Sequence, residues 1–229
     1  MIHFVKAYDA SRAKQHLVLM SPGGLSGLNV YTSATQNEVV GSSADIFAAS
    51  IGWADYLENP PDNDNGKPSI LDRDHVRPTD TRAPMLVWKA FARGHHYSLY
   101  DQPFEAPSME DSAWELARRN IGAVVRYANS VFSDLAKMLP SDGLSSTRYA
   151  LANPGSEYLI VQPESGAFTV TMQPGTYNYE WFDPNTASTA DIGVVSLTAG
   201  KNTFTPPLSG RAVLYLKSAP SMEPGSPTE

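Results

Sequence analysis

The first 140 residues alternate between short apolar runs that end at turn-forming residues and segments in which apolar side chains recur at helical spacing. The apolar runs have the form of buried strands and cover residues 16–21, 44–50, 67–72 and 96–101. One helical segment starts near Pro84 and stops at Gly94, and a longer one, 108–139, carries an apolar stripe that includes Trp114. Buried strands that alternate with amphipathic helices predict a parallel sheet with helical crossovers. We therefore expect an α/β domain over residues 1–140.

The pattern changes to a period of two after Pro140. Phe168, Val170 and Met172 alternate with threonines, and turn sequences such as "NPGS", "QPGT" and "TAGK" separate short strands. This spacing predicts a small antiparallel β-sandwich over residues 147–217. We expect the domain boundary between residues 139 and 147, and a disordered tail or linker over the Pro- and Ser-rich residues 218–229.

The first residues form a helical pattern without a start signal. Ile2, Val5 and Tyr8 stand at helical spacing, and no capping residue precedes them. We expect Met1 to lie inside a helix that begins upstream of it.

Charge and composition exclude several classes of partner. The formal net charge of -7 and the lack of clustered Lys and Arg argue against nucleic acid. Without cysteine the chain has no disulfide, thiolate zinc site or cysteine nucleophile. No stretch reaches the roughly 18 apolar residues of a membrane span, and the first residues lack the form of a signal peptide. Neutral polymers and small molecules fit this composition better.

Charged side chains crowd the end of the third apolar run, in "PSILDRDHVRP" (68–78). Parallel α/β folds bind ligands at the carboxyl ends of their strands, where Asp72 and Asp74 fall. Strand alternation puts these two carboxylates on one side and Arg73 and His75 on the other. The carboxylates could thus share a cavity while the bases orient them. A plain alternative is an Asp-Arg pair that closes a strand-to-helix turn.

Aromatic and acidic residues follow the neighbouring strands. Asp101 ends the fourth run after His96 and Tyr100, and Trp53 follows the second run. Aromatic rings that stack on a pyranose beside carboxylates that bind hydroxyls are typical of a sugar subsite. The same aromatic residues could instead belong to the core or its rim, and Asp101 could cap a loop.

The sequence predicts no metal and no cofactor. His95 and His96 are adjacent on a strand and should point to opposite faces, and neither has a His or Glu partner at ligand spacing. A Gly-x-Ser-x-Gly nucleophile motif is lacking, and "SPGGLSG" has neither the spacing nor the Lys of a phosphate-binding loop.

Several motifs together resemble a known family. "PSILDRDHVRP", "VWKAFARGHHYSLYDQPF" and "ARRNIGAVVRYAN" are similar, in this order, to the carboxyl-terminal part of the apiosidase-like glycoside hydrolases, which are bacterial (β/α)8-barrel enzymes. "STRYALANPGSEYLIVQP", "GTYNYEWFDPNT" and "FTPPLSGRAVLYLK" resemble the β-sandwich that follows the barrel in that family and is labelled a collagen-binding domain. The resemblance covers nearly the whole chain. Arg73 departs from the family, which has Thr there, and "HVRPTDTRAP" replaces a His-Trp-Gly stretch, so the cleft wall should differ.

The resemblance implies half of a TIM barrel. An eightfold barrel needs roughly 200 residues or more, whereas about 140 residues with four strands precede the predicted sandwich. Counted back from the sandwich, the run 67–72 is the seventh strand of the barrel. Retaining glycosidases of this architecture carry an acid/base after the fourth strand and a nucleophile after the seventh. The resemblance thus implies a catalytic role for Asp74 or Asp72, whereas the acid/base lies outside this chain.

We therefore expect the carboxyl-terminal portion of a carbohydrate-active glycoside hydrolase that is catalytically incomplete alone. Its substrate would be an oligo- or polysaccharide, bound by His75, Arg73, Trp53, His96, Tyr100 and Asp101. The resemblance implies a secreted or periplasmic full-length protein. One alternative is a non-catalytic carbohydrate- or matrix-binding module built on the sandwich, and another is a structural accessory that binds nothing. The exposed edges of the two terminal strands favour self-association.

Overall fold

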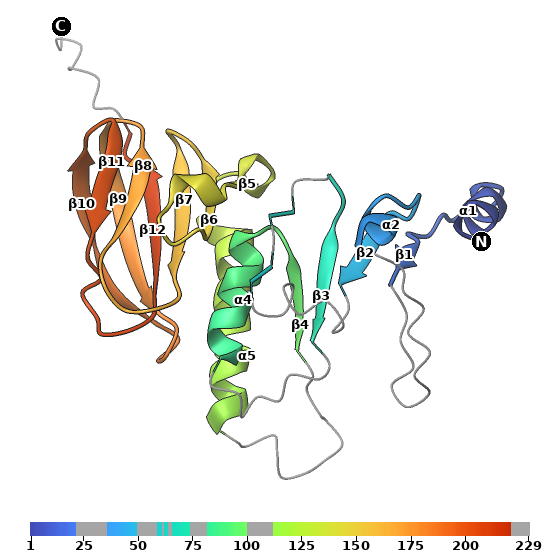
Figure 1. The fold of residues 1–229 in the computed structure, drawn as a ribbon, viewed down its shortest axis with the longest axis horizontal. Coiled ribbons are helices and arrows are strands. Elements are labelled where there is room, and N and C mark those ends of the chain that lie inside the picture. Colours follow the sequence, from blue (N-terminus) through green and yellow to red (C-terminus); the bar gives the residue numbers. More distant parts are fainter. Residues whose placement is uncertain are drawn as a thin grey trace, which may run out of the picture. The chain divides into compact units, whose positions relative to one another are not determined.

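The computed structural model describes residues 1–21, 36–49, 59–60, 62–63, 66–73, 82–99 and 112–220. The chain divides into two compact units, Met1–Val131 and Phe132–Glu229 (Figure 1). The fold is mixed α/β, with more strand than helix. The interval 139–147, where the sequence predicts a boundary, lies within the second unit, because Leu139 and Pro140 already pair with the second unit's strands.

The first unit contains a sheet in the order β1-β2-β3-β4, in which each neighbouring pair is parallel (Figure 1). Its elements in chain order are α1 (Ile2–Ala10), β1 (Leu19–Met20), α2 (Gln36–Val40), β2 (Ile46–Ala49), β3 (Ser69–Arg73), α4 (Ala83–Ala92), β4 (His96–Leu99), α5 (Ser112–Arg126) and the π-helical turn η2 (Tyr127–Val131). These strands overlap the apolar runs of the sequence. The parallel order follows from the helical crossovers between them.

Helix α4 begins and ends at its sequence signals. Pro84 lies in the first turn, where a missing backbone N–H costs no helical hydrogen bond. Gly94 follows the helix with a φ of 77°, a left-handed conformation that suits glycine. The helix is buried along most of its length, so it forms part of the core of the first unit.

Trp88 joins α4 to α5. Its side chain is fully buried, and its Nε1 donates a hydrogen bond to Oδ1 of Asn120 at 2.8 Å. The rings of Trp88 and Tyr127 pack edge to face, with their centroids 5.5 Å apart. Asn120 in turn donates to the carbonyl of Leu116 at 2.9 Å. The Trp88 side chain thus fills space in the core and also gives the buried Asn120 amide a hydrogen-bond partner.

The second unit is built from antiparallel strands, as the period of two predicts. A six-stranded sheet has the order β10-β9-β12-β7-β6-β5, and a two-stranded sheet pairs β11 with β8 (Figure 1). The elements are η3 (Leu135–Lys137), β5 (Leu139–Pro140), η4 (Asp142–Leu144), β6 (Ala150–Asn153), β7 (Glu157–Gln162), β8 (Phe168–Met172), β9 (Gly175–Asp183), β10 (Ser188–Leu197), β11 (Gly200–Phe204) and β12 (Ala212–Ser218).

One hydrophobic core joins both sheets of the second unit. Phe168 of β8 meets Trp181 of β9 edge-on at a centroid distance of 6.0 Å and stacks on Phe204 of β11 at 5.9 Å. These rings belong to a buried cluster that also takes in β6, β7 and β12. The two-stranded sheet is therefore held to the six-stranded one by packing of apolar side chains.

A buried carboxylate fastens the first residues of the second unit to its large sheet. Glu157 is 1% exposed and accepts hydrogen bonds from the backbone N–H of Ser133 at 2.9 Å and from the hydroxyl of Tyr215 at 2.9 Å. Lys217 lies 3.7 Å from the same carboxylate. The ring of Phe132 packs on Tyr215, with centroids 5.5 Å apart. Several donors thus compensate the burial of this charge.

Tyr177 gives the second unit a sensitivity to alkali. Its side chain is 1% exposed, its hydroxyl donates to the carbonyl of Gln173 at 3.1 Å, and its ring meets Tyr158 edge-on. Burial, and then the neighbouring Tyr158, raise the pKa of Tyr177 from 10.0 to about 12. The unfolded chain therefore ionises this phenol first, so the stabilisation is present below pH 10 and is lost as the pH rises toward 12.

We expect the free energy of unfolding of the wild-type chain to fall between pH 10 and about 12, and Tyr177→Phe to flatten this fall. The variant should also lose about 1 kcal/mol at neutral pH with its hydrogen bond. Urea unfolding at a series of pH values measures both effects. Tyr8→Phe, at a residue that is 56% exposed, is the matched control. An unchanged alkaline slope in Tyr177→Phe would assign the sensitivity to other groups.

Candidate functional site

The carboxyl ends of the parallel strands define the candidate site. β1 ends at Met20, β2 at Ala49, β3 at Arg73 and β4 at Leu99. Because the strands are parallel, these four ends lie along one edge of the sheet, which we call the carboxyl edge. Open α/β sheets and barrels bind their ligands at this edge, since the connecting loops leave it there.

The register of β3 and β4 brings two polar positions together at this edge. Asp72 is paired with Ser98, and Arg73 is paired with Leu99. Neighbouring strands lie about 4.8 Å apart, so the positions of Asp72 and Ser98 are direct neighbours across the sheet. Both lie within the last two residues of their strands.

The structure places three of the eight predicted site residues. Asp72 and Arg73 are the last two residues of β3, at the carboxyl edge. His96 is the first residue of β4 and is paired with Ile70, so it lies farther from this edge than Asp72, and its side chain is exposed. The other predicted residues lie outside the described part of the chain: Trp53, Asp74, His75, Tyr100 and Asp101.

One face of the sheet, the covered face, packs against helices α2 and α4. Its buried apolar cluster consists of Val39, Phe47, Leu71 and Ala90. A polar pair is buried with it, because Ser69 Oγ lies 2.7 Å from Nδ1 of His95 and both residues are almost fully buried. His95 is therefore a core residue, and its neighbour His96 is exposed. This difference agrees with the alternation of adjacent strand residues.

The opposite face, the open face, is less well covered. The register assigns to it Leu19, Ile46, Ala48, Ile70, His96 and Ser98. Leu19 is 46% exposed, and His96 and Ser98 are exposed as well. Sequence reasoning missed Ser98, although counting two residues on from His96 would have placed it on this face.

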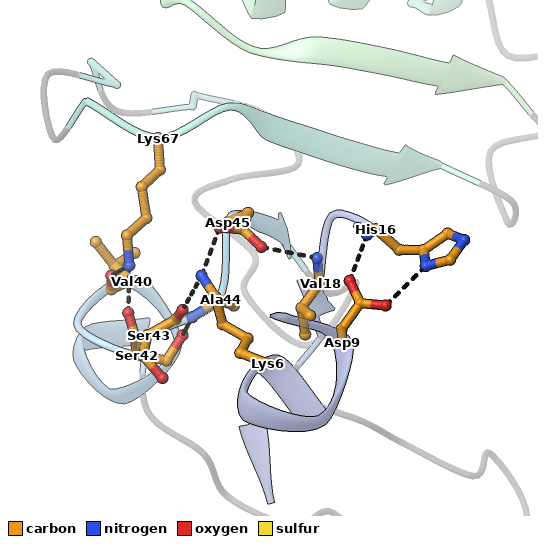
Figure 2. A network of polar contacts seen from close by, with 10 residues as sticks. All are labelled: Lys6, Asp9, His16, Val18, Val40, Ser42, Ser43, Ala44, Asp45 and Lys67. Carbon is orange, nitrogen blue, oxygen red and sulfur yellow. Dashed lines mark hydrogen bonds and ion pairs between the residues drawn. The ribbon is translucent and has the colours of Figure 1, made fainter. Parts of the chain in front are cut away.

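A polar network holds the opposite, amino-terminal edge of the same sheet (Figure 2). Lys6 of α1 donates to the carboxylate of Asp45 at 2.6 Å and to the carbonyl of Ser43 at 3.1 Å. The second oxygen of Asp45 accepts from the backbone N–H of Val18 at 2.9 Å, just ahead of β1. Lys6, and next the N–H of Val18, lower the pKa of Asp45. Asp45 thus joins α1, β1 and β2 at the end of the sheet remote from the candidate site.

Further contacts of Lys67 and Asp9 lie beside this network (Figure 2). The ammonium group of Lys67 donates to the carbonyls of Val40, at 2.9 Å, and Ser42, which closes the end of α2. Asp9 accepts from the backbone N–H of His16 and lies 2.9 Å from its Nδ1, and these contacts lower the pKa of Asp9. All of these residues serve to fasten local structure, and none reaches the carboxyl edge.

We expect Asp45→Asn to reduce the acid sensitivity of the first unit. A lowered folded pKa means that the stabilisation is present above the ordinary value of 3.8 and is lost as the pH falls through the lowered value. The amide cannot titrate, so circular dichroism from pH 7 to pH 2 should show a shallower loss of structure than in the wild type. Lys14→Met, at an exposed lysine that makes none of these contacts, should leave the acid transition unchanged. Equal transitions in Asp45→Asn and the wild type would contradict this role.

Among the described residues, no three His, Asp or Glu side chains converge as metal ligands would. No helix in the described ranges has the length and apolar character needed to cross a membrane.

Comparison with solved structures shows a fold like that of glycoside hydrolases. A family 30 subfamily 8 xylanase from Clostridium acetobutylicum matches 95% of this chain and 60% of its own length, with a TM-score of 0.51 and 13% identity. Another glycoside hydrolase matches 67% of this chain and 43% of its own length, with a TM-score of 0.47 and 11% identity. A family 5 protein from Bacteroides vulgatus matches 66% and 42%, with a TM-score of 0.42 and 13% identity.

The chain spans less than two thirds of the length of each of these proteins. No family model matches the sequence. No curated protein matches it either. At such low identity the likeness to the xylanase establishes the fold alone.

Proposed function

We propose that the first unit is the carboxyl-terminal half of the (β/α)8 barrel of a retaining glycoside hydrolase, and that the second unit is the β-sandwich that follows it. The observation that carries the proposal is the register at the carboxyl edge, where β3 ends in Asp72 and Arg73 beside the last residues of β4. Carboxylates at that place in a parallel α/β fold are positioned for chemistry on a ligand. The xylanase-like fold and the order of the motifs agree with this assignment.

The free side of β1 supports the half-barrel assignment. Phe4, Val5 and Tyr8 form a helical stripe on α1 and are between 41% and 75% exposed. In a strand–helix–strand crossover, the helix connects two parallel strands and packs its apolar stripe on the sheet that they form. Helix α1 leads into β1, so it would be the helix of such a crossover, and the strand ahead of it would lie beside β1. A further strand beside β1 would pack against this stripe and pair with the free edge of β1. Without such a strand, the bare edges of β1 and β4 favour self-association.

Asp74 is the proposed nucleophile, and Asp72 the proposed ligand of a sugar hydroxyl. If the alternation of β3 continues, positions 72 and 74 share the open face with Ile70, and position 74 lies farther out. Arg73 and His75 would orient the two carboxylates. The remaining proposed sugar contacts are Trp53, His96, Tyr100 and Asp101.

The reaction uses two carboxyl groups about 5 to 5.5 Å apart. The nucleophilic carboxylate forms a bond to the anomeric carbon while a carboxylic acid protonates the leaving glycosidic oxygen. The same acid group, now a carboxylate, then removes a proton from water, which attacks the anomeric carbon and releases the enzyme's nucleophile. In this proposal the acid/base belongs to the other half of the barrel, so the present chain supplies the nucleophile, and binding contacts for an oligo- or polysaccharide.

We expect the purified chain to release no reducing sugar from xylan or other polysaccharides above the background rate. Proton transfer by the acid/base contributes about 10² to 10⁴-fold in rate, and half of the cleft is absent with it. A polypeptide in which a homologous barrel half precedes Met1 should be active in the same assay. Robust turnover by the present chain, or none by the completed one, would contradict the proposal.

A second candidate function is a carbohydrate- or matrix-binding module without catalysis. The observation in its favour is that the second unit has its own continuous core, which spans both of its sheets. The apiosidase-like resemblance contributes the collagen-binding label and the expectation of a secreted or periplasmic protein. Co-sedimentation of residues 132–220 with insoluble xylan, or with collagen fibrils, would support this candidate.

A further inference from the structure

Two polar side chains on the open face lack the internal partners that polar side chains on the covered face have. His96 and Ser98 are exposed, and no described residue gives either side chain a hydrogen bond. On the covered face, by contrast, Ser69 and His95 are buried and lie within 2.7 Å of each other through their polar atoms. The side chains of His96 and Ser98 therefore carry hydrogen-bonding groups that the described part of this chain does not use.

Ser98 is the better placed of the two. It is paired with Asp72, whereas His96 is paired with Ile70, farther from the carboxyl edge. Because neighbouring strands lie about 4.8 Å apart, the backbone positions of Asp72 and Ser98 are direct neighbours at the carboxyl edge. A serine hydroxyl both donates and accepts, so it can bind a sugar hydroxyl in either sense.

The composition of this face also points to a ligand. The interior of a complete (β/α)8 barrel is filled by layers of bulky, branched apolar side chains. β2 and β3 place Ile46 and Ile70 on this face, together with the small Ala48 of β2, whereas β4 places the polar His96 and Ser98 at two successive positions of it.

We propose that Ser98 is a substrate-binding residue that hydrogen-bonds a pyranose hydroxyl in the subsite next to Asp72. The inference rests on the proposed function, because it assumes that the carboxyl edge binds sugar. It adds a contact from β4 that does not depend on the catalytic carboxylates.

The test is a titration of the full chain with a panel of oligosaccharides, namely xylohexaose, cellohexaose and mannohexaose, in which the saturation-transfer NMR signal of each sugar reports its binding. We expect saturable binding to the wild type and about three- to tenfold weaker binding to Ser98→Ala, the loss of one hydrogen bond to a ligand. Thr171→Ala, which removes an exposed hydroxyl from strand β8 of the second unit, should bind as the wild type does. The melting temperatures of both variants should equal that of the wild type.

The outcomes separate the two proposals. Binding by the wild type with equal affinity in Ser98→Ala would overturn the role of Ser98 and leave the sugar-binding edge standing. Absence of binding in the wild type would overturn the proposed function, and the role of Ser98 with it. A lowered melting temperature in Ser98→Ala that accounts for all the lost affinity would make Ser98 a structural residue.

Discussion

In a polypeptide whose barrel is completed upstream of Met1, Asp74→Asn is expected to lower turnover by about 10⁴ to 10⁶-fold, the scale on which removal of a catalytic nucleophile or its partners lowers kcat. The amide keeps the size of the carboxylate but cannot form the glycosyl intermediate. The loss should appear in kcat, because the nucleophile acts on the reacting bond. The melting temperature should stay close to that of the unchanged enzyme, since a strand-end side chain that faces a cleft contributes little to the core.

Asp72→Asn is the matched comparison. A residue that binds a hydroxyl should affect KM as well as kcat, and its loss should cost less than that of Asp74. Full turnover in Asp74→Asn would remove it from the catalytic pair. A collapse of the melting temperature in either variant would favour the plain alternative, in which these residues close a strand-to-helix turn.

Trp88→Ala is expected to destabilise the first unit by about 3 to 5 kcal/mol. The indole is fully buried between α4 and α5, so its removal leaves a large cavity and takes away the hydrogen bond to Asn120. The stability of Trp88→Phe should lie between that of the wild type and that of Trp88→Ala. The phenyl ring keeps much of the volume, but the Asn120 oxygen loses its donor, at a cost of about 1 to 3 kcal/mol. Urea unfolding, monitored by circular dichroism, measures the change.

Phe4→Ala is the control for that experiment. Phe4 is 75% exposed, so its truncation should change the stability of the isolated chain by no more than about 0.5 kcal/mol. A loss of less than about 1 kcal/mol in Trp88→Ala would mean that α4 and α5 do not share a core.

The elements of the first unit could be predicted because each has a strong local signal. Apolar runs ended by Gly, Pro or Asp identify the strands, and Pro84 and Gly94 mark the two ends of α4. The parallel order follows from the helices between the strands. The boundary between the two units, after Val131, has no such local signal. The residues that follow it belong to the second unit through long-range contacts, such as the hydrogen bond between Ser133 and Glu157.

The candidate site was less predictable for the same reason. Local spacing identifies Asp72 as a strand-end residue, but only the register with β4 shows that Ser98 is its neighbour. The roles of Lys6 and Asp45 depend on a contact between residues far apart in sequence, which no local pattern reports. The other predicted residues, Trp53, Asp74, His75, Tyr100 and Asp101, remain predictions.

The most direct test of a sugar-binding carboxyl edge is a protein-observed NMR titration of the 15N-labelled chain with a panel of oligosaccharides, namely xylohexaose, cellohexaose and mannohexaose. We expect saturable shifts in the backbone amide signals of residues 70–73 and 96–99, and unchanged signals over residues 150–218. Shifts confined to the second unit, or no shifts at millimolar sugar, would contradict a glycoside hydrolase cleft on the parallel sheet.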